Sequence, residues 1–144
     1  MISFFIYTFL PLVGGIIVSI FSDVASYNII NKPILSPPSF IFPIIWTILY
    51  LLLGYSSYIT KDDKKSLKIF YINLAINFIW TFIFFNLSNY FQGFILILIM
   101  ILLEGILLFR YYKTNKKAFN INVIYTIWLI YAAYLSLGVY ILNQ

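Results

Sequence analysis

The chain has 144 residues, of which 63% are hydrophobic, 22% aromatic and only 9% charged. A soluble domain carries about 25% charged residues, so the composition excludes a water-soluble globular domain, and its hydrophobicity excludes an intrinsically disordered chain. The absence of Cys and His removes disulfides, thiolate nucleophiles, catalytic imidazole and the usual zinc and haem ligands. Four acidic residues are too few for a carboxylate metal cage, and no metal site is expected.

Five apolar segments follow one another along the chain, each about as long as a bilayer crossing requires. They cover residues 2–21, 39–59, 67–87, 91–111 and 121–141. The first has no preceding positive residue and no clear cleavage site, which favours a retained helix over a cleaved signal peptide. Within it, Gly15 and Ser19 have a spacing that permits close helix approach. The sequence therefore predicts an all-α integral membrane protein, a single bundle of five transmembrane helices.

Only one connection is long. It covers residues 22–38, where Pro33, Pro37 and Pro38 prevent a continuous helix. Pro43 falls in the first turns of the second span, where a missing N–H costs little. We expect the other connections to be a charged turn at 60–66, an uncharged turn at 88–90 and a basic turn at 113–120.

The positive residues are distributed unequally between the two sides of the predicted bundle. Eight of nine share a side with the N-terminus: Lys61, Lys64, Lys65, Lys68, Arg110, Lys113, Lys116 and Lys117. Lys32 is the one on the other side. Because cytoplasmic loops are enriched in Lys and Arg, we expect a cytoplasmic N-terminus, with the C-terminus and the 22–38 loop outside. This pattern accounts for the net charge of +5 better than nucleic-acid binding does, and no nucleic-acid partner is expected.

Polar and aromatic residues recur on one face of three spans. These are Asn73, Asn77, Trp80 and Phe84 in the third, Trp46, Tyr50 and Leu53 in the second, and Tyr125, Trp128, Ala132 and Leu135 in the fifth. Amides are costly to expose to lipid, so both Asn side chains should point into the bundle. The tryptophans lie too deep to be interfacial anchors. Together these residues could line a pocket for a planar apolar ligand; helix packing is the alternative.

Glu104 is the one acidic residue well inside a span, which makes it a functional-site hypothesis. Arg110 follows six residues later on another face and is not an obvious partner. Three interpretations of Glu104 are possible: its carboxyl is neutral, it is hydrogen-bonded to a helix, or it lies at an interface between protomers. Asp23 and Lys32 could pair across the cavity mouth, but two solvated loop charges are the favoured interpretation.

Three stretches carry motifs that occur together in one known family. The first contains Asn31-Lys32-Pro33, Pro37-Pro38 and Phe42-Pro43 through Trp46-Thr47 to Leu49-Tyr50. The second contains Asn77, Trp80, Thr81, Phe84 and Phe85, and the third Tyr125, Trp128, Tyr131, Ala132, Tyr134 and Leu135. In this order they resemble the TspO/MBR family, which comprises the tryptophan-rich sensory proteins and the mitochondrial translocator protein, or peripheral-type benzodiazepine receptor.

The resemblance implies a five-helix bundle, commonly a homodimer in membrane lipid, that binds porphyrins, haem and drug-like isoquinolines or benzodiazepines. It implies ligand contacts at Tyr27, Trp46, Asn73, Asn77, Trp128 and Ala132, and a cap over the cavity from the first loop, with Lys32, Pro33, Pro37, Pro38 and Pro43. No cofactor is required, and without His a tetrapyrrole would be held by stacking and shape. A sensory or regulatory role in a bacterial cell membrane is expected.

One feature limits the resemblance, and the function that it implies has alternatives. The family's C-terminal cholesterol motif needs a Tyr followed by a basic residue, but Leu137 and Ile141 stand there, so sterol binding is not expected. The resemblance also implies an alternative, a light-dependent porphyrin-degrading enzyme that uses Trp46 and Trp128. Small-molecule transport and a ligand-free scaffold are further alternatives.

Overall fold

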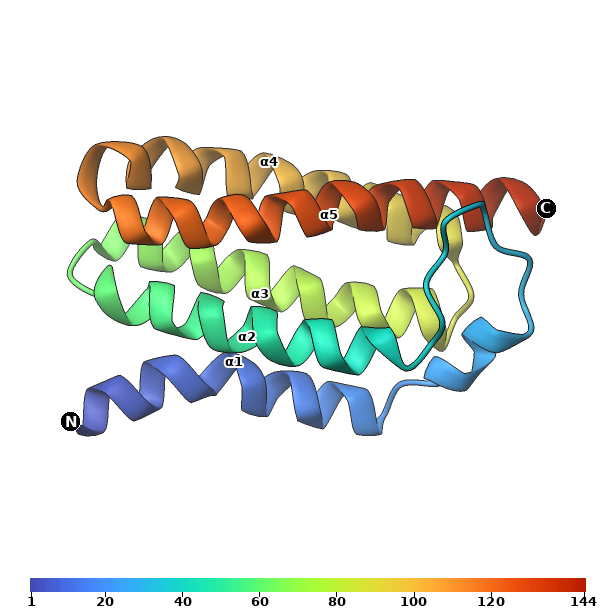
Figure 1. Cartoon of the computed structure of the whole chain (residues 1–144), viewed down its shortest axis with the longest axis horizontal. Coiled ribbons are helices and arrows are strands. Elements are labelled where there is room, and N and C mark those ends of the chain that lie inside the picture. The colour runs from blue at the N-terminus through green and yellow to red at the C-terminus, as the bar shows by residue number, and fades with distance from the viewer.

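The computed structural model describes all 144 residues and contains five α-helices and no strand (Figure 1). The helices are α1 (Ile2–Ile20), α2 (Ile41–Ile59), α3 (Lys64–Phe85), α4 (Tyr90–Thr114) and α5 (Lys116–Leu142). A short 3-10 helix, η1 (Val24–Asn28), lies within the long loop. Each α-helix is long and apolar enough to cross a membrane, which confirms the predicted all-α membrane fold.

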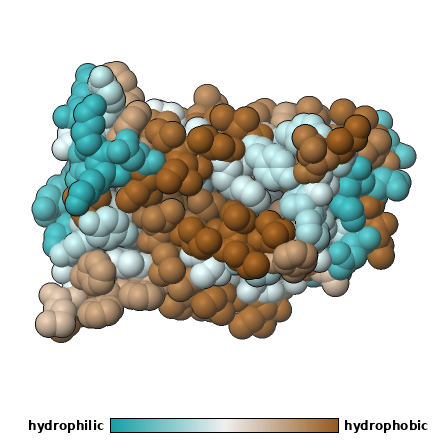
Figure 2. Space-filling view, viewed as in Figure 1, coloured by the Kyte–Doolittle hydropathy of each residue, from teal (hydrophilic) through white to brown (hydrophobic).

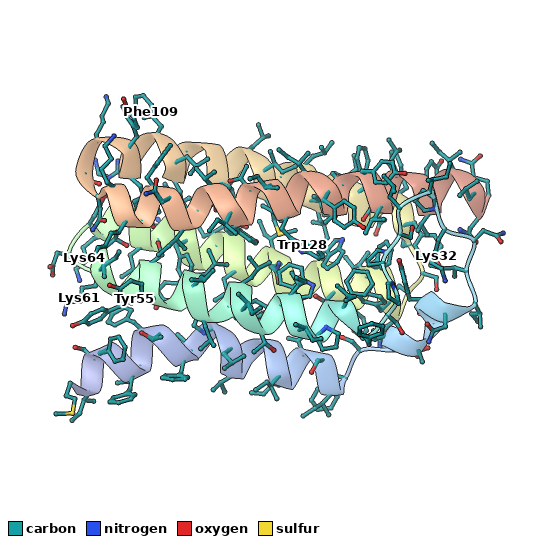
Figure 3. All side chains as sticks on the ribbon, in the orientation of Figure 1. Lys32, Tyr55, Lys61, Lys64, Phe109 and Trp128 are labelled. Carbon is teal, nitrogen blue, oxygen red and sulfur yellow. The ribbon has the colours of Figure 1, made fainter.

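The helices form a closed ring in which neighbours run antiparallel, except α1 and α3, which run in the same direction. α1 packs extensively on α2, α2 packs on α5, α5 on α4 and α4 on α3, while α3 closes the ring against α1 through fewer contacts. The N-terminus lies at the same end as the α2–α3 and α4–α5 connections, and the C-terminus lies at the opposite end with η1 (Figure 1). We call these the basic end and the loop end. Lys61 and Lys64 lie at the first and Lys32 at the second (Figure 3).

The outer surface is apolar between two hydrophilic ends (Figure 2). α1 contributes strongly to it, because only 11% of its spanning window is buried inside the bundle. Its exposed side chains include Phe5, Ile6, Val13, Ile16 and Ile17. In water such a surface would be unstable, but lipid tails are as apolar as these side chains. The helices therefore associate through packing and internal hydrogen bonds.

The helices extend further into the charged segments than hydropathy indicates. The segment 113–120, expected as a basic turn, is helical except at Asn115, and α3 begins within the expected 60–66 turn. Side-chain caps explain both sharp connections. Asp63 accepts a hydrogen bond from the Ser66 amide at 3.2 Å, and Asn115 accepts one from the Ala118 amide at 3.1 Å. Lys and Arg are good helix formers, so the helices continue after the apolar residues end.

α1 and α2 approach each other closely at Gly54. A Cβ atom placed there would lie 2.0 Å from the Thr8 carbonyl oxygen. At Gly15, the equivalent atom would lie 2.2 Å from the Tyr50 ring. The small residue of α1 predicted to permit close approach therefore makes room for an aromatic ring, while the glycine that brings two backbones together is on α2.

Gly54→Ala should destabilise the protein, because the added methyl group meets backbone atoms that cannot move aside independently. We expect a loss of about 1–3 kcal/mol, measured as a lower Tm in detergent. Gly105→Ala is the matched control, since a Cβ atom there has nothing within 4 Å. An unchanged Tm in Gly54→Ala would contradict the tight α1–α2 contact.

Candidate functional site

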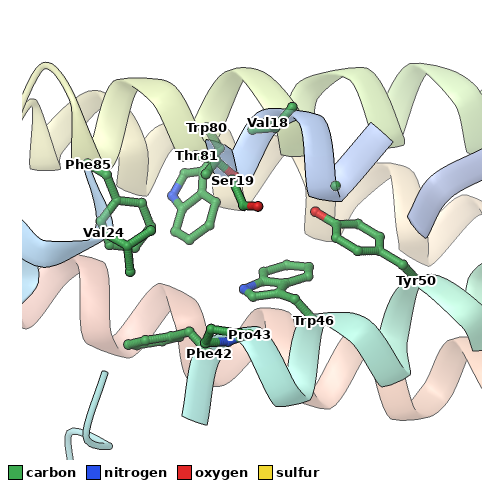
Figure 4. A pocket seen from close by; sticks show the side chains of 11 residues that line it. Val18, Ser19, Val24, Phe42, Pro43, Trp46, Tyr50, Trp80, Thr81 and Phe85 are labelled. Atoms are coloured by element: carbon green, nitrogen blue, oxygen red, sulfur yellow. The ribbon is translucent and has the colours of Figure 1, made fainter. Parts of the chain in front are cut away.

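Two adjoining cavities occupy the half of the bundle nearer the loop end, and we call them together the aromatic pocket. One has an empty volume of about 310 Å³ and is lined by Tyr27, Phe42, Trp46, Trp80, Phe84, Phe85, Trp128, Ala132, Leu135 and Ser136. The other, about 480 Å³, shares Phe42, Trp46, Trp80 and Phe85 and adds Gly15, Val18, Ser19, Val24, Pro43, Tyr50 and Thr81 (Figure 4).

The three tryptophans of the chain meet in this pocket from three different helices. The Trp46 ring centroid lies 6.1 Å from that of Trp80 and 6.2 Å from that of Trp128, the latter in an edge-to-face arrangement. Trp46 also stacks on Tyr50, with centroids 5.3 Å apart and planes inclined by 28°. The convergence predicted from the helix faces is therefore present, and it places several π-faces around one space.

Buried polar atoms in the pocket lack hydrogen-bond partners. They are the indole nitrogens (Nε1) of Trp80 and Trp128 and the hydroxyl of Ser136. A buried donor without an acceptor costs about 1–3 kcal/mol. The pocket is thus apolar over most of its wall, and two of the tryptophans that line it have an indole N–H without an acceptor in the protein.

Asn77 lies beneath the pocket and connects three helices. The Tyr50 hydroxyl donates to Asn77 Oδ1 at 2.7 Å, and Asn77 Nδ2 donates to the Tyr125 hydroxyl at 3.4 Å. All three side chains are buried. Asn77 thus fixes Tyr50, whose ring stacks on Trp46, and it reaches the pocket through Tyr50 rather than lining the pocket itself.

Asn73 occupies a different place from the one expected of a pocket residue. It lies nearer the basic end, beside a separate cavity of about 190 Å³ that we call the polar cavity, lined by Leu53, Phe70, Asn73, Leu74, Glu104 and Tyr125. Asn73 Nδ2 donates to Glu104 Oε2 at 3.0 Å and to the Met100 carbonyl at 3.4 Å. Glu104 is therefore inside the bundle, bonded to a neighbouring helix, and not on the outer surface.

Residues 29–36 close the loop end through hydrogen bonds with α5. The Tyr131 hydroxyl donates to the Leu35 carbonyl at 2.6 Å, and the Tyr134 hydroxyl donates to the Ile34 carbonyl. Asn143 accepts from the Asn31 amide at 3.0 Å and donates to its carbonyl at 2.7 Å. The loop is thus attached along one helix over the mouth of the bundle.

The predicted cap residues have distinct contacts within this loop. Lys32 Nζ donates to the Tyr27 carbonyl at 2.8 Å and lies 4.7 Å from the Tyr27 ring centroid. The Tyr27 hydroxyl donates to the Pro37 carbonyl at 3.1 Å. Burial raises the pKa of Tyr27 above its ordinary value of 10.0, so this hydroxyl remains a neutral donor. Lys32 forms no ion pair with Asp23, in agreement with the interpretation favoured from the sequence.

The other residues predicted to cap the cavity are prolines. Pro33 packs against Gly138, where an added Cβ would lie 2.5 Å from the ring. Pro38 precedes α2, and its carbonyl accepts from the Ile41 amide at 3.1 Å. Pro43 lines the aromatic pocket itself. The prolines therefore both shape the loop and form part of the pocket wall.

The partner of Arg110 is Asp63, at the basic end. Arg110 Nη2 contacts the two carboxylate oxygens of Asp63 at 2.7 and 2.9 Å, and its Nε donates to the Ser66 hydroxyl at 2.7 Å. The Ser66 hydroxyl and amide, together with Arg110, lower the pKa of Asp63 from 3.8 to about 2. This cluster ties α3 to α4 and leaves Glu104 without a cationic partner.

Three residues that line the 310 Å³ cavity are not among the predicted ligand contacts: Phe42, Phe85 and Ser136. The other cavity adds Gly15, Val18, Ser19, Val24 and Thr81, which were not predicted as ligand contacts either. Phe42 makes edge-to-face contacts with Tyr27, Phe85 and Trp128, at centroid distances of 4.9, 6.4 and 6.4 Å. Its place at the start of α2, next to Pro43, is the signal that could have identified it.

Comparison with known proteins finds one family model and several relatives that match most of the chain. The model of the TspO/MBR family matches residues 7–142. The "Tryptophan-rich protein TspO" of Archaeoglobus fulgidus is 32% identical over 122 residues, covering 81% of this chain and 79% of its own. "Protein CrtK" of Rhodobacter capsulatus is 28% identical, covering 87% and 82%. The "Translocator protein homolog" of Schizosaccharomyces pombe is 30% identical, covering 78% and 74%.

The double variant Tyr131→Phe, Tyr134→Phe should release the loop without changing the pocket wall. Each lost hydrogen bond contributes about 0.5–1.5 kcal/mol, so backbone amides in the 29–36 segment should exchange with deuterium roughly tenfold faster, measured by mass spectrometry. Tyr140→Phe is the control, because no hydrogen bond of its hydroxyl joins it to the loop. Equal exchange in all three proteins would show that these hydroxyls do not hold the loop closed.

Proposed function

Because the chain belongs to the TspO/MBR family, we propose that this multi-pass membrane protein binds a planar tetrapyrrole, a porphyrin or haem, in the aromatic pocket. We further propose a sensory or regulatory role in tetrapyrrole handling. Drug-like isoquinolines and benzodiazepines, which are also flat and aromatic, are expected to compete for the same space.

The observation that carries this proposal is the convergence of three tryptophans around one cavity, two of them with unused indole N–H groups. Aromatic faces attract flat π-systems in stacked or edge-on arrangements. A porphyrin supplies such a face, and its carboxylates could accept from an indole N–H group such as that of Trp128. An aliphatic ligand would supply no aromatic face.

The chain also restricts how a tetrapyrrole could be held. It contains no His or Cys, which are common axial ligands of haem iron. Binding by stacking and shape does not depend on the metal, so metal-free protoporphyrin should bind at least as well as haem.

The test is an absorbance titration of protoporphyrin IX with the detergent-solubilised protein. Trp128→Phe keeps an aromatic ring but removes the donor, and should weaken binding roughly ten- to a hundredfold, in keeping with about 1.5–3 kcal/mol for a hydrogen bond to a charged group. Trp46→Leu removes the central ring and should weaken it further. Phe109→Leu is the control, because Phe109 is 64% exposed and lies at the basic end (Figure 3). Non-saturable binding, or equal affinity in all variants, would refute the proposal.

We also propose that the basic end faces the cytoplasm and the loop end faces outward. Five antiparallel passes put eight of nine Lys and Arg residues at one end, and this asymmetry determines orientation in most multi-pass proteins. Lys113 and Lys116 lie 4.2 and 4.1 Å from the ring centroids of Phe109 and Tyr112, as expected of side chains that extend along the apolar surface towards the interface.

The lack of Cys makes this orientation directly measurable, because any introduced thiol is the only one in the protein. In intact cells, Ile34→Cys should react with a membrane-impermeant maleimide, since Ile34 is 83% exposed at the loop end. Asp62→Cys, in the exposed turn of the basic end, should react only after the cells are opened. The reverse labelling pattern would invert the proposed topology.

A further inference from the structure

The polar cavity contains a carboxyl group whose hydrogen bonding is incomplete. Glu104 is 1% exposed, and its Oε2 accepts from Asn73 Nδ2 at 3.0 Å. Its other oxygen, Oε1, has no partner, and neither has Asn73 Oδ1. Both residues line the same 190 Å³ space. Two buried acceptor oxygens therefore adjoin this cavity with no donor within hydrogen-bond distance of either of them.

No positive side chain is available to neutralise Glu104. Arg110, the nearest in sequence, is engaged by Asp63 at the basic end, and no other ion pair is formed. The titratable groups facing Glu104 are Tyr125 from α5 and Tyr111 from α4 itself. α3 contributes the amide of Asn73, and α2 contributes the apolar Leu53. None of these groups can carry a positive charge.

A carboxylate in such a place is far more costly than a carboxylic acid, because burial of an uncompensated charge is opposed by its lost hydration. A proton removes the charge and converts one acceptor oxygen into a donor. We propose that Glu104 is a proton-binding site inside the membrane, and that the charge state of this carboxyl is coupled to the aromatic pocket. This inference is independent of the proposed ligand, because the site exists in the protein alone.

A continuous series of side chains provides the coupling. Tyr125 lines the polar cavity with Glu104, and its hydroxyl accepts from Asn77. Asn77 in turn accepts from Tyr50, whose ring stacks on Trp46. When Glu104 loses its proton, a full negative charge appears beside Tyr125 in a medium of low dielectric constant. Reorientation of the Tyr125 hydroxyl would alter the Asn77 hydrogen bonds and thereby the environment of Trp46.

Infrared spectroscopy tests the proton site, first in the wild-type protein and then in two variants that assign the band. In a detergent free of carbonyl groups at neutral pH, the wild-type protein should show the C=O band of one buried carboxylic acid, shifted in D₂O. The band should be absent in Glu104→Gln, which keeps an acceptor for Asn73, and present in Asp62→Asn, a control in the exposed turn. Absence of the band in the wild type, or its persistence in Glu104→Gln, would overturn the proposal. A carboxylate band that shifts with sodium concentration would also overturn it, by indicating a metal cation instead.

Tryptophan fluorescence tests the coupling. Raising the pH until the carboxylic acid band disappears should change the emission of the wild type, while Glu104→Gln should not respond over the same range. Tyr50→Phe should retain the infrared band but lose the emission response, because it breaks the link to Asn77. Identical emission changes in the wild type and Glu104→Gln would show that the aromatic pocket does not respond to this carboxyl.

Discussion

The structure depends on one constraint: lipid offers no hydrogen bonds, so the backbone polar groups of each spanning segment must bond to one another within a helix. Polar side chains are costly in lipid for the same reason, and Asn73, Asn77, Asn122 and Glu104 are all buried inside the bundle. They gather in the half near the basic end, where Asn122 donates to the Ser56 hydroxyl at 2.7 Å and Asn73 donates to Glu104. The half near the loop end is filled mainly by aromatic rings.

The sequence was sufficient to predict the helices and the convergence of the tryptophans, because both depend on local periodicity. Long apolar runs identify spanning helices without any knowledge of their neighbours. Trp46, Trp80 and Trp128 each lie on a polar-aromatic face well inside a span, and such faces can only be buried together. The helix ends were harder to predict from the sequence. Asp63 and Asn115 cap helices within charged segments that hydropathy assigns to turns.

The division of the interior into two cavities could not be predicted in the same way. Asn73 and Asn77 lie one turn apart on the same face of α3, so periodicity treats them alike. Their environments differ because of what the other helices place opposite them: Glu104 beside Asn73, and Tyr50 with Tyr125 beside Asn77. The attachment of the loop was equally hidden, because Tyr131 and Tyr134 bind backbone carbonyls that carry no sequence signal.

The unequal lengths of the helices have a consequence for the membrane in which the protein can work. α1 has 19 residues and spans about 28 Å, whereas α5 has 27 residues and spans about 40 Å. α5 therefore extends beyond the hydrocarbon layer, and its last turns hold the loop at Asn143. α1 has no such excess, and it contributes Gly15, Val18 and Ser19 to the wall of the aromatic pocket. α2 also has 19 residues, and it lines the same pocket through Phe42, Trp46 and Tyr50. A bilayer much thicker than about 30 Å would draw the ends of α1 and α2 into lipid before those of the longer helices, so bilayer thickness acts first on the two helices that form this wall.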